Sequence, residues 1–231
     1  LNKILIFREN ALNLENRTLS RKEGTLGAIL VVGQGSNFTD FKQVSGLQSI
    51  SGATEKVTHE MKNVTLNGLG NNVLDINALT LVNLDATHKF EDITVNNSQD
   101  DGIEIFGGSV NMSNITVKDA LDDYFDTDHG HTGTITKLNL IQTDSNKGKS
   151  LVECGNSNGT TATKFENLTY NGGNDASAYT NNGDDPNFNI KEGSVVVINE
   201  VTLNGLQDNF PVQPVVNDEY VMDASIGNVP E

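Results

Sequence analysis

Ile93-Thr94-Val95-Asn96 recurs 22 residues later as Ile115-Thr116-Val117-Lys118, and 23 residues after that the chain reads Leu138-Asn139-Leu140. Each copy alternates apolar and polar side chains, the period-two pattern of a half-buried strand. Related copies begin at Val64, Leu168 and Val201. A repeat near 22 residues with several short strands per unit is too short for a propeller blade, and it suits one coil of a parallel β-solenoid.

A second strand follows in each unit, with Ile103-Glu104-Ile105 equivalent to Phe125-Asp126-Thr127. Alternation turns the two flanking residues of each triplet inward and the acid outward. We therefore expect an all-β parallel β-helix of about nine or ten coils over residues 26–210. Residues 1–25 are expected to form an N-terminal cap, an irregular first coil or a segment lent to a neighbour, and residues 211–231 a closing segment.

The composition excludes several classes of function. The chain has 231 residues and a formal net charge of −16, which disfavours nucleic acid and anionic lipid as partners. No apolar run approaches the length of a membrane span. One cysteine, Cys154, excludes a disulfide framework, and alternation in its strand predicts that it is buried and packs rather than reacts.

Acidic residues repeat with the same 22-residue period as the strands. The offset places the following acids over one another: Asp100 and Asp122, Asp101 and Asp123, Glu104 and Asp126. Two unit charges about 5 Å apart repel by roughly 3 kcal/mol at an effective dielectric constant near 20. A bound cation relieves that cost, and Ca²⁺ is favoured because it accepts several oxygen ligands in loose geometry. The predicted calcium ligands are Asp100, Asp101, Glu104, Asp122, Asp123, Asp126 and Asp128.

A metal-free alternative stays open for these acids. With an offset of 23, Asn146 follows Asp123 and Lys149 follows Asp126, so the ammonium of Lys149 would neutralise Asp126 in a solvated ladder. His129 and His131 beside Asp128 form a weak transition-metal set, and two exposed imidazoles in a polar turn are the simpler interpretation.

The acidic stretches carry a resemblance to a known family. Residues 100–111, which begin Asp-Asp-Gly and include two adjacent glycines, and residues 122–133 resemble motifs of bacterial secreted β-helix proteins, many of them surface lipoproteins with a right-handed, pectate-lyase-like coil. Ile103 and Ile105 replace aromatic residues of that pattern, Tyr124 replaces an aspartate and His131 a tyrosine. The match covers about residues 90–135, and it implies a right-handed parallel β-helix with an extracellular or outer-surface address.

Three functions fit these features. The first is a structural or adhesive surface protein, which self-associates through open solenoid ends or through residues 1–25. The second binds acidic polysaccharide through calcium, and the third is a calcium-dependent polysaccharide lyase. A lyase needs a strong base beside the metal, yet no arginine follows Arg21, and Lys118 and Lys149 are the lysines nearest to the acids. No nucleophile motif is present, so the sequence favours a protein that is not an enzyme.

Asn-x-Ser/Thr triplets are frequent, and we attribute them to strand and turn chemistry rather than to glycosylation. The asparagines concerned are Asn16, Asn37, Asn63, Asn96, Asn111, Asn114, Asn158 and Asn167.

Overall fold

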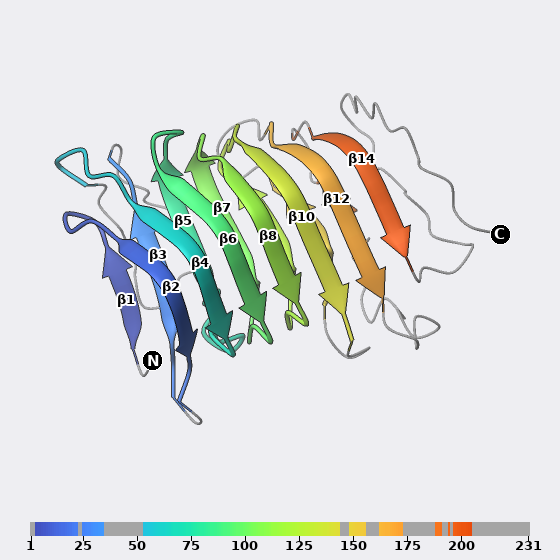
Figure 1. Cartoon of the computed structure of the whole chain (residues 1–231), viewed down its shortest axis with the longest axis horizontal. Coiled ribbons are helices and arrows are strands. Elements are labelled where there is room, and N and C mark those ends of the chain that lie inside the picture. The colour runs from blue at the N-terminus through green and yellow to red at the C-terminus, as the bar shows by residue number, and fades with distance from the viewer. Residues whose placement is uncertain are drawn as a thin grey trace.

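The computed structural model describes residues 3–22, 25–34, 53–143, 148–155, 162–172, 188–190, 194 and 196–204. Within them the chain forms two parallel sheets that run along the long axis of the molecule (Figure 1). The odd-numbered sheet contains β1 (Ile4–Phe7), β3 (Ala28–Val32), β5 (Leu79–Leu84), β7 (Ile103–Gly108), β9 (Phe125–Asp128), β11 (Val152–Cys154) and β13 (Phe188–Ile190). The even-numbered sheet contains β2 (Asn13–Ser20), β4 (Glu60–Asn67), β6 (Lys89–Asn96), β8 (Met112–Lys118), β10 (Thr134–Gln142), β12 (Lys164–Gly172) and β14 (Val197–Asn204).

This alternation of strands between two sheets confirms the predicted parallel β-helix. The described residues give seven strands to each sheet, so the expected nine or ten coils were too many. The estimate rested on a 22-residue coil, whereas equivalent strands such as β2 and β4 are 47 residues apart. Of the alternatives for residues 1–25, the structure shows a first coil, because β1 pairs with β3 and β2 with β4. The closing segment 211–231 lies outside the described residues.

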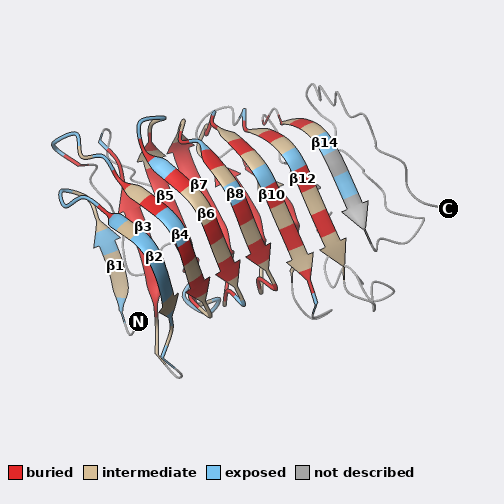
Figure 2. Ribbon diagram, viewed as in Figure 1, coloured by how far each residue is buried: buried red, intermediate tan, exposed pale blue. Residues whose placement is uncertain are grey.

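The core lies between the two sheets, and its side chains form columns one residue deep per coil. One such column in the even-numbered sheet contains Val64, Ile93, Ile115, Leu138 and Leu168, all at most 1% exposed. Figure 2 shows the resulting buried bands crossing β4 to β12. Burial of such columns is the main favourable term in folding. In the first coil Arg17 takes the equivalent position and is exposed, and a charge at an inward position of an edge strand opposes unspecific strand pairing.

The residue before each of these inward positions adopts a left-handed backbone conformation. This occurs in all seven strands of the even-numbered sheet, with φ between 50° and 58°, at Asn16, Asn63, Asp92, Asn114, Lys137, Asn167 and Glu200. Asparagine and aspartate tolerate this conformation better than other residues with a Cβ atom. They also bond to one another between coils: Asn63 Nδ2 donates to Asn16 Oδ1, and Asn114 Nδ2 to Asp92 Oδ1, both over 2.6 Å.

Two histidines form a stacked pair that the sequence did not suggest. The rings of His59 and His88 lie 5.2 Å apart and nearly parallel. The amide of Leu12 donates to His59 Nδ1, and the amide of His59 donates to His88 Nδ1, each over 3.0 Å. Burial lowers the pKa of both rings, and the charge of His59 further lowers the pKa of His88. The rings therefore accept backbone hydrogen bonds as neutral imidazoles and link the first three coils.

The part of the chain that the structure describes holds no helix with the length and apolar character that a membrane span needs.

Lys137 provides a test of the left-handed column, because it is an exposed lysine flanked in that column by Asn114 and Asn167. We expect Lys137→Asn to raise the free energy of unfolding by roughly 1 kcal/mol, since asparagine adopts this conformation at lower cost. Lys137→Val should lower it by a similar amount, because β-branched residues are the least compatible with positive φ. Denaturant unfolding of both variants measures the difference, and equal midpoints would contradict the explanation.

Candidate metal centre

The predicted acids lie on the outer face of the odd-numbered sheet and on the turns that lead into β7, β9 and β11. Glu104 is in register with Asp126, and Asp126 is in register with Glu153. The register between β7 and β9 is thus the predicted 22 residues. The next offset is 27 residues, not 23, because the turn between β10 and β11 is longer than the strand pattern indicated. The column of acids consequently continues to Glu153, which the sequence analysis missed.

Lys149 is correspondingly misplaced in the sequence prediction. Its Nζ lies 2.5 Å from Asp122 Oδ2, so it neutralises Asp122 rather than Asp126. Its backbone amide donates to the carbonyl of Asp122 over 3.0 Å, which continues the column Asp100–Asp122–Lys149. The predicted amide partner, Asn146, lies outside the described residues.

A second column consists of aspartates that hold the next coil. Asp101 Oδ1 accepts the backbone amide of Asp123 over 2.9 Å, and Asp123 Oδ1 accepts the amide of Ser150 over 2.8 Å. Gly102 follows Asp101 because there is no room for a side chain there: a Cβ atom would lie 2.4 Å from Val117 Cγ1 and 2.6 Å from the Tyr124 carbonyl oxygen. The Asp-Asp-Gly sequence therefore brings both aspartates against the following coil.

The acids form three overlapping groups, in each of which one oxygen per residue lies within 4.8 Å of the others. The groups are Asp100–Asp101–Asp122, Asp101–Glu104–Asp126 and Asp123–Asp126–Glu153. We call these seven residues the acidic cluster. Two ligand atoms on one Ca²⁺ ion, each at 2.3–2.6 Å, are at most about 5 Å apart, so each group has the spacing of a partial calcium shell.

Asp128, the remaining predicted ligand, belongs to none of these groups. It is in register with Phe106, and its Oδ2 lies 3.4 Å from His129 Nδ1. A Cβ atom on Gly155 would lie 2.3 Å from Asp128 Oδ1, so this glycine gives the carboxylate its space. Asp128 therefore belongs to a neighbouring polar contact.

Most of the acidic cluster points away from the core but is buried. Asp100, Glu104 and Asp126 are 1%, 3% and 5% exposed. Asn77 Nδ2 donates to Glu104 Oε2 and Asn72 Nδ2 donates to Asp100 Oδ1. Among the described residues, Asp100 Oδ2, Asp122 Oδ1 and Asp126 Oδ1 are buried without a hydrogen-bond partner. Buried carboxylate oxygens in this state are costly, so the predicted solvated ladder does not describe Asp126.

Burial and mutual repulsion raise the carboxyl pKa values. Desolvation and the charges of Asp75 and Asp122 raise the pKa of Asp100 to about 7. Desolvation with Glu153 and Asp122 raises that of Asp123 to about 7, against the hydrogen bonds from Ser150. Burial, and then neighbouring acids, raise the pKa values of Glu104 and Asp126 well above the usual range. Without a cation, part of the cluster is protonated near neutral pH.

The two histidines of the turn after β9 are not the exposed pair expected from the sequence. His131 is fully buried, with Nδ1 2.9 Å from the Thr163 hydroxyl and Nε2 3.1 Å from the Val110 carbonyl. Burial outweighs the contact with Val110 and lowers the pKa of His131 to about 4. The side chain of His129 is 9% exposed and meets the edge of Phe106.

Cys154 is buried as predicted, and the Thr127 hydroxyl donates to its sulfur over 3.1 Å. Burial raises the pKa of the thiol, which keeps it protonated and unreactive.

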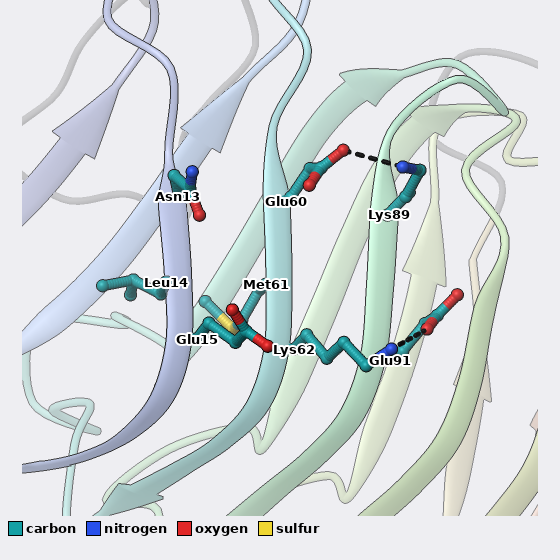
Figure 3. Close-up of a pocket in the computed structure, with 8 residues that line it drawn as sticks. All are labelled: Asn13, Leu14, Glu15, Glu60, Met61, Lys62, Lys89 and Glu91. Atoms are coloured by element: carbon teal, nitrogen blue, oxygen red, sulfur yellow. Dashed lines mark ion pairs between the residues drawn. The ribbon is translucent and has the colours of Figure 1, made fainter.

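A separate pocket of about 350 Å³ lies over β2, β4 and β6 (Figure 3). Its lysines are already paired, Lys89 with Glu60 at 2.9 Å and Lys62 with Glu91 at 3.4 Å. These pairs are exposed and contribute little stability. The pocket gathers no buried titratable group, so the acidic cluster is the stronger candidate site.

Comparison with protein families matches residues 19–229 to the pectate-lyase like beta helix domain. The chain belongs to this family. The match extends far beyond the acidic motifs and agrees with the two stacked parallel sheets. A search of curated proteins found no match to the chain.

The raised carboxyl pKa values give a pH dependence of defined sign. A folded carboxyl pKa above the unfolded value means that the native state binds more protons, so the free energy of unfolding falls as pH rises through the interval between them. For Asp100 and Asp123 this interval runs from the ordinary 3.8 to about 7. In chelator we expect a loss on the order of 2 kcal/mol between about pH 5 and pH 8, measured by chemical denaturation.

Asp100→Asn and Asp123→Asn together should flatten this profile, while Glu15→Gln on the exposed face of β2 should leave it unchanged. A profile that rises over the same range in the wild-type chain would contradict the proposed burial of the acids.

Proposed function

We propose that this protein is an extracellular or cell-surface β-helix with a structural or adhesive role, whose coils are held together by Ca²⁺ bound to the acidic cluster. The observation that carries the proposal is Asp126: it is 5% exposed, one of its oxygens has no partner among the described residues, and it takes part in two of the three acidic groups. A divalent cation supplies the missing partner and cancels the repulsion.

An extracellular address supports the choice of calcium. Pectate-lyase-like β-helix domains are often extracellular, and the acidic motifs resemble those of secreted surface proteins. Extracellular calcium modules bind with dissociation constants of roughly 10⁻⁴–10⁻³ M. A site formed by carboxylates from successive coils fits such a setting, because the ion then joins the coils that supply its ligands.

End-to-end self-association is the weaker part of this proposal. Its contact surfaces would be β1 and β2, the edge strands of the two sheets in the described part of the chain. Arg17 at an inward position of β2 opposes pairing with an apolar coil, so a partner would need an acid at the equivalent position.

Binding of an acidic polysaccharide is a second candidate, favoured by Lys149. Its side chain is 55% exposed beside the acidic cluster, so a uronate carboxylate can reach both the ammonium and a cation held by Asp122. A lyase receives less support. Burial lowers the pKa of Lys149, but the hydrogen bond from Lys149 to Asp122 and the nearby carboxylates outweigh it and raise the pKa, so this amine stays protonated and is a poor base.

Calcium is expected to stabilise the folded chain. At a concentration 100-fold above the dissociation constant, binding to the native state adds about 2.7 kcal/mol, which corresponds to a rise in Tm of roughly 5–10 °C over chelator. Asp126→Asn should abolish most of this rise, and Glu15→Gln should preserve it. Scanning calorimetry measures the effect, and superimposable wild-type transitions in calcium and chelator would refute the proposal.

Polysaccharide binding is tested by co-sedimentation with polygalacturonate or alginate. We expect retention in calcium, release by chelator, and weaker retention of Lys149→Gln, with Lys137→Gln as the matched surface control. Equal retention with and without calcium would count against a metal-bridged uronate, and ultraviolet absorbance of unsaturated products would show cleavage instead.

A further inference from the structure

Two of the three acidic groups are the same arrangement repeated one coil apart. Moving from Asp101, Glu104 and Asp126 to the next coil gives Asp123, Asp126 and Glu153. Asp126 is thus the last member of the first group and the middle member of the second. Equivalent atoms of neighbouring coils are separated by about 4.8 Å, so the repeat generates two equivalent sites with a shared carboxylate.

The third group shows how the series ends. The next-coil equivalent of Asp100–Asp101–Asp122 is Asp122, Asp123 and Lys149, because Lys149 follows Asp122 in its column. At that level the ammonium of Lys149, 2.5 Å from Asp122, supplies a positive charge from the protein itself. No such internal cation is bonded to Glu104 or Asp126 among the described residues.

The buried column also has neutral ends. The residue in register before Glu104 is Thr80, and the residue after Glu153 is Asn189. Amides bond to the two terminal acids: Asn77 Nδ2 donates to Glu104 Oε2, and Asn189 Nδ2 donates to Glu153 Oε2 over 2.5 Å. Asp126, between them, keeps a buried oxygen without a hydrogen-bond partner in the described residues.

Charge then sets the number of ions. The two groups contain five carboxylates, so one divalent ion leaves three negative charges in a buried site, whereas two ions leave one. Carboxylates that bridge two metal ions are a familiar arrangement in two-metal sites, where the ions lie about 3.5–4 Å apart.

We propose that the acidic cluster binds two divalent cations, one per coil, bridged by the carboxylate of Asp126, with Glu153 as a ligand of the second. This inference rests on the proposed calcium site and specifies its stoichiometry. It also predicts reciprocity: Glu104 serves only the first ion, Glu153 only the second, and Asp126 both.

The test counts bound Ca²⁺ on the full chain by isothermal titration calorimetry and native mass spectrometry. We expect two ions on the wild type, one on Glu104→Gln, one on Glu153→Gln and none or one weakly bound ion on Asp126→Asn. Asp128→Asn, an acid on the same face of β9 but outside both groups, is the matched control and should keep two ions. Circular dichroism of each variant verifies the fold.

Two outcomes separate this inference from the proposed function. A single ion on the wild type, or two ions retained by Glu153→Gln, overturns the two-ion site and leaves the calcium proposal standing. No bound calcium overturns both. A general structural role of Glu153 would lower Tm without changing the count from two to one.

Discussion

The in-register stacking of successive coils is the constraint on which the other features depend. Parallel ladder hydrogen bonds place each residue over its equivalent in the previous coil, at about 4.8 Å. A residue type repeated at the coil period therefore becomes a column. Val64, Ile93 and Ile115 become a dry core, Asn16 and Asn63 become a hydrogen-bonded pair, and Glu104 and Asp126 become two like charges in close proximity.

The sequence predicted the parts of this arrangement that have no insertions. Between β7 and β9 the coil is the shortest possible, so the spacing of two apolar–acid triplets defined their register. The error began at Lys149, because nothing in the strand pattern reveals the length of the turn before β11. The same uncertainty hid Glu153 and made the number of coils too large.

Burial on the outer face of the odd-numbered sheet was also beyond sequence reasoning. Alternation indicates which side of a strand a residue takes, but not what covers that side. Here Leu30, Val32, Val82 and Phe106 form a second apolar cluster on the outer face, and the acids continue the same face in later coils. The stacked histidines were in principle detectable, because the 29-residue separation of His59 and His88 equals that of Glu60 and Lys89, which are paired in β4 and β6.

The frequent Asn-x-Thr triplets acquire a structural cause in the left-handed column. Asn16, Asn63, Asn114 and Asn167 hold the positive-φ position, the next residue takes the inward position, and a threonine follows on the strand. Backbone conformation thus selects asparagine, and strand propensity selects threonine, with no need for a glycan. The acidic cluster has no comparable backbone reason: Glu104 and Asp126 occupy regular strand positions at which Thr80 and Asn189 serve equally well in neighbouring coils. Because the fold tolerates neutral residues in this column, the adjacent buried acids are best explained by a ligand that requires their charge.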